Sequence, residues 1–120
     1  MAVRGLRGAT TVDVDTVDEI MERTEELLKA LFERNELQKE QLISVLFTAT
    51  PDIHGAFPAA AARAFGLGDV PLICAQEIDV TGATALCIRV LMHLESDRAR
   101  SELHHIYLHG ARLLRDDLPQ

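Results

Sequence analysis

The sequence of 120 residues contains 12 basic and 19 acidic residues, which gives a formal net charge of −7. A chain of this length is expected to form one domain, residues 1–120, with enough buried surface for one core. Its 48 % hydrophobic content is typical of a globular protein. The acidic balance argues against a nucleic-acid partner, and no apolar run reaches the ~20 residues of a membrane span.

Cysteine and arginine usage adds two expectations. No apolar leader opens the sequence, because Arg4 and Arg7 interrupt it, so we expect a cytoplasmic protein whose thiols, Cys74 and Cys87, are both free. A disulfide between them is the alternative. Ten of the twelve basic residues are arginine, whose planar fork suits carboxylates, although a G+C-rich genome or thermal adaptation would also enrich it.

The N-terminal third predicts a strand followed by a helix. Residues 2–12 have strand character, and the odd spacing of Arg4 and Arg7 places them on opposite faces. Residues 16–34 then show an apolar stripe at helical spacing, and Thr16 and Glu19 have the spacing of a capping box. This stripe predicts core packing and no chemistry.

The middle of the chain predicts a buried strand and an alanine-rich helix. Residues 42–49 are almost continuously apolar, which is typical of a central strand covered on both faces. Pro58 then opens a helix that we expect to end at Gly66. Ala60 and Arg63 share one face of this helix, which suits a close neighbour, either a ligand or another subunit; plain packing is the alternative.

The stretch from Cys74 to Arg89 predicts a β-hairpin that reverses at residues 79–82. The second strand alternates, with an apolar face from Leu86 to Leu94 and Arg89 on the opposite side. Glu77 lies near the end of the first strand. A carboxylate and a guanidinium on neighbouring strands either face one cavity or form a surface salt bridge.

Residues 104–108 predict a last strand that carries Tyr107, the one tyrosine of the chain. The expected fold is therefore α+β, a mixed five-stranded sheet with helices on one face. His105 and His109 would lie ~13 Å apart on a strand, too far to share an ion, so we expect no metal site. No phosphate-binding glycine loop is present.

The polar groups on the predicted strands are arginines, one carboxylate, one phenol and one thiol. This set suits a small polyanion with a hydroxyl group. It also suits electrostatic catalysis better than acid–base catalysis, because arginine does not lose its proton in the useful pH range.

Five motifs in order resemble the monofunctional AroH-type chorismate mutases. They are residues 4–12 (RGLRGATTV), 50–59 (TPDIHGAFPA), 74–82 (CAQEIDVTG), 87–90 (CIRV) and 105–108 (HIYL), and the likeness covers essentially the whole chain. It implies a homotrimer built as a trimeric pseudo-α/β barrel, with active sites between subunits. It also implies the Claisen rearrangement of chorismate to prephenate, in phenylalanine and tyrosine biosynthesis. This reaction is unimolecular, so the resemblance implies that no cofactor is needed.

The resemblance also implies roles for individual residues. Arg89 would contact the ether oxygen of the breaking bond, Glu77 the ring hydroxyl with Cys74 nearby, and Arg7 and Tyr107 the side-chain carboxylate. The implied pocket and its mouth comprise Phe57, Ala59, Ala60, Arg63, Ile73, Leu114 and Arg115.

Two departures and two alternatives accompany the resemblance. Ala60 stands where some relatives carry a lysine, and Asp116 stands where a proline is common; both concern substrate entry. One alternative is an imine deaminase of similar trimeric fold, and the other is a non-catalytic trimeric ligand-binding module.

Overall fold

The structure is a computed structural model that describes residues 2–114. In chain order its strands and helices are β1 (Ala2–Thr11), α1 (Val17–Asn35), β2 (Leu42–Ala49), α2 (Pro58–Ala62), β3 (Leu72–Gln76), β4 (Cys87–Ser96) and β5 (Ile106–Tyr107). Short 3-10 turns follow α1, β4 and β5, at Lys39–Gln41, Arg100–Glu102 and His109–Leu113. The α+β expectation is confirmed, with two helices and five strands.

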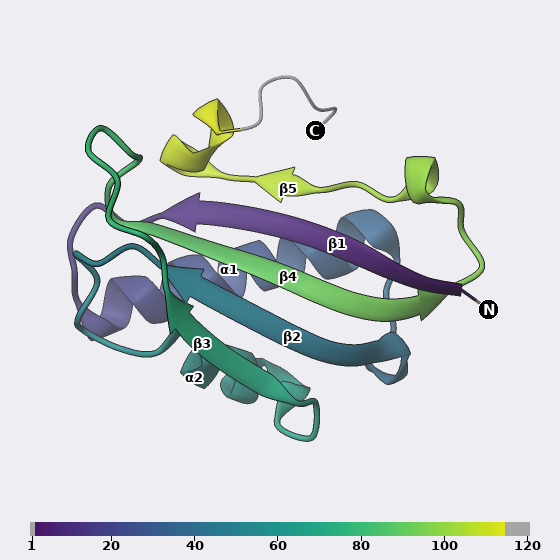
Figure 1. Cartoon of the computed structure of the whole chain (residues 1–120). Helices are drawn as coiled ribbons and strands as arrows, with labels where there is room; N and C mark the ends of the chain where they lie inside the picture. Colours follow the sequence, from purple (N-terminus) through teal and green to yellow (C-terminus); the bar gives the residue numbers. More distant parts are fainter. Residues whose placement is uncertain (1, 115–120) are drawn as a thin grey trace.

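The five strands form one mixed sheet in the order β3-β2-β4-β1-β5. β4 is the central strand and runs antiparallel to β2 and β1, whereas the outer pairs β2–β3 and β1–β5 are parallel. Both helices pack behind the sheet in Figure 1, and the opposite face is left uncovered within residues 2–114. No helix in that described part of the chain is long and apolar enough to span a membrane.

The predicted β-hairpin between residues 74 and 89 is wrong. β3 and β4 do not pair, because β2 lies between them and forms hydrogen bonds with both. The connection, residues 77–86, is too long for a tight reversal and carries the chain across the end of β2. The predicted alternation on β4 is confirmed, since Ile88, Val90 and Leu94 are buried and Arg89 is exposed.

The hydrophobic core lies between α1 and the covered face of the sheet. Leu27, Leu28 and Leu31 of α1 are fully buried there, as the helical stripe predicts. The close approach needs glycine at position 8, because a Cβ on Gly8 would lie only 3.0 Å from Leu31 Cδ1 and 3.1 Å from Leu27 Cδ1. This contact fixes β1, and therefore the neighbouring Arg7, against the rigid helix.

The start of α1 is capped differently from the prediction. The Thr16 hydroxyl accepts a hydrogen bond from the Glu19 N–H (3.3 Å), which is half of a capping box. The Glu19 carboxylate reaches back past Thr16 and accepts from the Asp13 N–H. It also lies 3.6 Å from Arg23, so it joins the incoming loop to the first turn of the helix.

Three element predictions need smaller corrections. β2 is not covered on both faces, because only its Val45 and Phe47 side is fully buried under the helices. The last strand is limited to Ile106–Tyr107, since the chain turns at His109 with φ 53°. The α2 region continues beyond Ala62 as a π-turn, Arg63–Leu67, in which Gly66 has φ 108°.

Candidate active site

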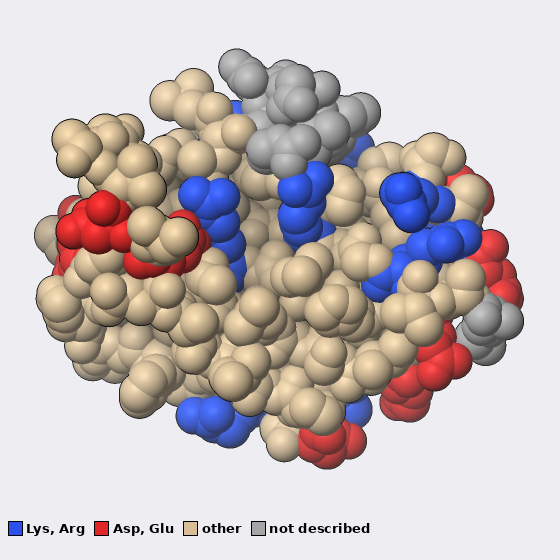
Figure 2. Space-filling view, viewed as in Figure 1, with Lys and Arg blue, Asp and Glu red and all other residues tan. Residues whose placement is uncertain are grey.

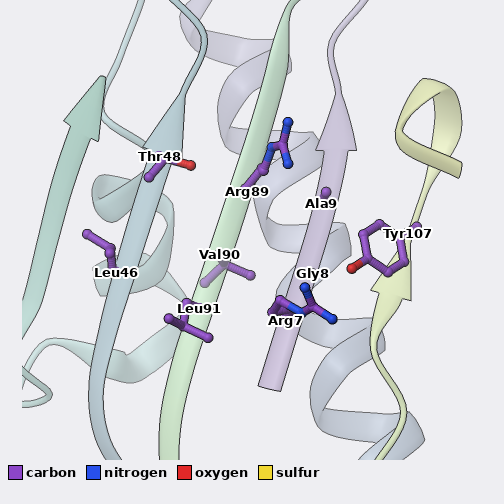
Figure 3. A pocket seen from close by; sticks show the side chains of 9 residues that line it. All are labelled: Arg7, Gly8, Ala9, Leu46, Thr48, Arg89, Val90, Leu91 and Tyr107. Carbon is purple, nitrogen blue, oxygen red and sulfur yellow. The ribbon is translucent and has the colours of Figure 1, made fainter. Parts of the chain in front are cut away.

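A pocket of about 250 Å³ opens on the uncovered face of the sheet. It crosses four strands, β2, β4, β1 and β5. We call it the arginine pocket; Figure 3 shows its lining residues, Arg7, Gly8, Ala9, Leu46, Thr48, Arg89, Val90, Leu91 and Tyr107. Three predicted site residues, Arg7, Arg89 and Tyr107, are therefore brought together.

Arg7 and Tyr107 lie side by side because β1 and β5 pair in parallel. Ala9 is the ladder partner of Tyr107, and the Tyr107 side chain is buried against Ala9 and Ala111. The Arg7 backbone N–H donates a hydrogen bond to His105 Nδ1 (3.0 Å), which adds a second contact between the two strands. The guanidinium and the phenol thus reach the pocket from a fixed backbone.

Arg89 reaches the pocket from β4 and is held by Glu77. The Arg89 Nε atom lies 3.1 Å from Glu77 Oε2, and the two side chains are 44 % and 18 % exposed. The salt-bridge interpretation of this pair is confirmed, and of the two residues Arg89, but not Glu77, is among those that line the cavity. Thr48, which sequence analysis did not single out, lines the same cavity.

A cluster of hydrogen bonds around Asp52 fixes the start of β4. The Thr50 hydroxyl accepts from the Cys87 N–H (2.9 Å) and donates to Asp52 Oδ1 (2.6 Å). Asp52 Oδ2 accepts from the N–H of Leu86 (2.9 Å), whose φ is 49°. These contacts hold the backbone immediately before Arg89 in an unusual conformation.

Burial and hydrogen bonding shift two pKa values in this cluster. Burial acts to raise the pKa of Asp52, but hydrogen bonds from Thr50 and the backbone, with the charge of His54, lower it below its ordinary value of 3.8. Burial raises the pKa of the Cys87 thiol to about 11, against the opposing charge of Arg89. Cys87 is therefore an unreactive thiol at neutral pH.

Phe57 and Cys74 lie apart from the arginine pocket. They line a separate cavity of about 390 Å³, and Cys74 packs toward the helix-covered core. The Phe57 side chain is exposed, and the loop before it is tied down by Asp15, whose carboxylate accepts from the N–H groups of His54 and Gly55 at 2.8–3.0 Å. One chain therefore does not bring Cys74 to the arginines.

The remaining predicted residues that the structure describes line neither of these two cavities. Ala59 is buried in the core, Ala60 is half-buried and Arg63 is exposed on the π-turn. Ile73 is exposed and lines a small cavity of about 150 Å³ on the uncovered face, and Leu114 packs near Tyr107. Arg115 lies outside the described residues.

The charge pattern of the uncovered face favours an anionic ligand. Figure 2 shows basic side chains in a band across this face, whose remaining area is mostly uncharged, with acidic side chains gathered toward its ends. Within residues 2–114, no group of three or more His, Cys, Asp and Glu side chains could hold a metal ion. Fold and pocket together define an α+β protein with an arginine-lined pocket on an uncovered sheet face.

Comparison with known proteins gives the family. The model of chorismate mutase type I matches residues 3–118, so the chain belongs to the type I chorismate mutase family, a family of isomerases. It is 44 % identical over 119 residues to "Chorismate mutase AroH" of Bacillus subtilis (strain 168), covering 98 % of this chain and 94 % of that protein. It is 45 % identical over 117 residues to the Thermus thermophilus protein of that name, covering 97 % and 96 %.

The fold agrees with this assignment. A solved chorismate mutase from Clostridium thermocellum superposes with a TM-score of 0.89 at 46 % identity, covering 91 % of this chain and 97 % of that one. The sequence-based resemblance is thereby confirmed, and the imine deaminase alternative is set aside.

Proposed function

We propose that the protein rearranges chorismate to prephenate, a Claisen reaction on the route to phenylalanine and tyrosine. The observation that carries this proposal is the arginine pocket, in which Arg7, Arg89 and Tyr107 converge on one face of the sheet. Chorismate carries two carboxylates and a hydroxyl group, so it matches the chemistry of this pocket. Family membership supplies the reaction.

The first task of the site is to hold the flexible substrate in a compact, chair-like form. In our proposal Arg7 and Tyr107 hold the side-chain carboxylate, one through charge and the other through its phenol. Both rest on strands that are anchored by backbone pairing. Fixing the reacting ends near each other lowers the entropic part of the barrier.

The second task is to stabilise the negative charge that develops on the ether oxygen as its C–O bond breaks. We assign this role to Arg89, and we assign acceptance from the ring hydroxyl to Glu77, which lies against Arg89. A charge that is already in place acts without reorganisation in the transition state. The reaction is unimolecular and transfers no proton, so this account requires neither a nucleophile nor a cofactor.

We further propose that the active protein is a homotrimer with sites between subunits. The arginine pocket, at about 250 Å³, is small and open compared with the ~300–1,000 Å³ of typical ligand sites. Its surroundings expose apolar side chains, including Val3 and Ile73, at 61 % and 64 %. A neighbouring chain would cover this face and could bring its own Phe57 and Arg63 to the pocket.

Sedimentation equilibrium combined with activity measurements at the same protein concentrations tests the assembly. We expect a trimer that loses activity when dilution dissociates it. A monomer with full activity would contradict the shared site.

We place the enzyme in the cytoplasm. Cys74 and Cys87 are both free thiols in the structure, which suits a reducing compartment. Retention of full activity in millimolar thiol reductant agrees with this placement, whereas recovery of the native protein with a Cys74–Cys87 disulfide would contradict it.

A chorismate turnover assay tests the function directly. We expect loss of chorismate absorbance together with formation of prephenate by the wild-type protein and by Arg100→Ala, a control at an exposed arginine of a 3-10 turn. Arg89→Ala should lose this activity. Tight chorismate binding without turnover by the wild-type protein would instead identify a non-catalytic binding module.

A further inference from the structure

Thr48 lines the arginine pocket at its β2 edge. It lies on β2, where its ladder partner on β4 is Arg89, and it is half-buried. Its hydroxyl donates a hydrogen bond of 2.6 Å to Glu77 Oε2. This length falls in the range of short, charge-assisted bonds between a hydroxyl and a carboxylate.

Only one oxygen of the Glu77 carboxylate, Oε2, has polar contacts within residues 2–114. Oε2 receives both the Thr48 hydroxyl (2.6 Å) and Arg89 Nε (3.1 Å). Within residues 2–114, the hydrogen bonds and ion pairs of this carboxylate all fall on Oε2. The Glu77 backbone is fixed as well, because its N–H donates to the Ala49 carbonyl (2.9 Å).

We propose that Thr48 is a positioning residue for the rearrangement. Its hydroxyl orients the Glu77 carboxylate so that Oε2 faces Arg89 and Oε1 is left to accept from a hydroxyl group of the substrate. Glu77 in turn lies on the Nε side of Arg89, at 3.1 Å, and in this proposal the terminal N–H groups of the guanidinium serve the developing oxyanion. The inference rests on the proposed function, since it gives Thr48 a role in that same site.

The chemistry of threonine suits this role. A β-branched side chain on a strand has few accessible χ1 rotamers, so the hydroxyl is directed with little loss of conformational entropy. Arg89 Nε alone would leave the carboxylate free to rotate about that single contact. The hydrogen bond from Thr48 on β2 and the ion pair with Arg89 on β4 meet at one oxygen, and together they fix the orientation of the carboxylate.

Three variants isolate the hydroxyl. Thr48→Val removes it at nearly constant volume, Thr48→Ser keeps it, and Thr81→Val makes the same change at an exposed threonine of the 77–86 connection. We expect Thr48→Val to lower kcat/KM by about 10-fold or more, as loss of one hydrogen bond to a charged group does. Most of that loss should fall in kcat, because Arg89 acts in the transition state. Thr48→Ser should recover most of the activity, and Thr81→Val should match the wild type.

A double-mutant cycle with Glu77→Ala separates positioning from structural damage. If Thr48 acts through the Glu77 carboxylate, Thr48→Val should cost little more once that carboxylate is absent. An equal loss in both backgrounds, or Thr48→Val kinetics within twofold of the wild type, would overturn the inference. If Thr48→Val does not assemble, Thr48→Ala removes the hydroxyl without adding a methyl group and takes its place in the same cycle.

The chorismate assay of the wild-type protein distinguishes failure of the proposed function from failure of the inference about Thr48. Absence of chorismate turnover by the wild-type protein refutes the proposed function, and this inference with it. An active wild type whose rate is insensitive to the Thr48 hydroxyl refutes the inference alone.

Discussion

Arg89 and Glu77 form an ion pair of 3.1 Å between Nε and Oε2, although their strands are not neighbours in the sheet. β2 lies between β3 and β4, and Glu77 reaches Arg89 because it lies just beyond the last residue of β3. The contact is made on the Nε side of the guanidinium. The planar fork of arginine therefore retains its terminal N–H groups for a ligand.

Arg89→Ala should lower kcat by more than about a hundredfold, since loss of one oxyanion donor typically costs about 10²–10³ in rate. Arg89→Lys keeps the charge but loses the fork, so it should also be severely impaired. Arg63→Ala, on the exposed π-turn, should mainly raise KM. Steady-state kinetics with gel filtration check these results. Near-normal kcat in Arg89→Ala would reduce the pair to a structural salt bridge.

The rate should change little between about pH 6 and 9, and it should show no solvent deuterium effect. The reason is that no proton is transferred in the rearrangement and arginine stays charged throughout this range. Measurements of kcat across that range, in H₂O and D₂O, test both statements. A bell-shaped profile centred near neutrality would indicate acid–base chemistry instead.

The sequence allowed the faces of the strands to be predicted but not the order of the strands. The alternating pattern of β4 correctly placed Arg89 on the face opposite to Ile88 and Val90. Side chains alternate between the two faces of a strand regardless of which strands lie beside it. The false hairpin arose because a strand–turn–strand pattern is local, whereas the insertion of β2 between β3 and β4 depends on contacts distant in sequence.

In the candidate site, too, some residues could be assigned from the sequence and others only from the structure. Arg7 and Tyr107 were assigned through the family resemblance, because an arginine or a tyrosine on a strand does not by itself mark a site; the structure places both in one pocket. Thr48 could not be assigned, since threonine is an ordinary strand residue and its hydroxyl acquires meaning only beside Glu77. The relation of Phe57 to the arginines depends on a second chain in our proposal, so no single-chain pattern predicts it.

Asp52→Asn should destabilise the protein at neutral pH, and the difference from the wild type should shrink in acid. The pKa of Asp52 is lower in the folded state than its ordinary value of 3.8. Its ionised form therefore contributes stability above about pH 4, which is lost as pH falls through the lower, folded-state pKa. Asparagine cannot supply two acceptor oxygens to Thr50 and Leu86.

Urea unfolding at pH 7, 5 and 3 measures this effect, with Asp79→Asn on the exposed 77–86 connection as the control. A destabilisation of Asp52→Asn that is the same at all three pH values would argue against ionisation of Asp52 as its source. Because this cluster fixes the backbone just before Arg89, the variant should also lose kcat at pH 7 under conditions where it remains folded.

Mixing two inactive variants tests whether the active site is shared between chains. Arg89→Ala removes the arginine-pocket half, and Phe57→Asp places a negative charge at the exposed aromatic side chain of the other cavity. In mixed trimers, a site that joins the intact arginine pocket of one chain to the intact Phe57 of the next contains no substitution. Random assembly of equal amounts should therefore restore about one quarter of wild-type activity, since each interface combines two independently chosen chains. The variants are mixed in denaturant, refolded together and assayed, with each variant refolded alone as the control. If each site lay within one chain, every site in the mixture would carry one of the two substitutions, and the refolded mixture would be as inactive as its components.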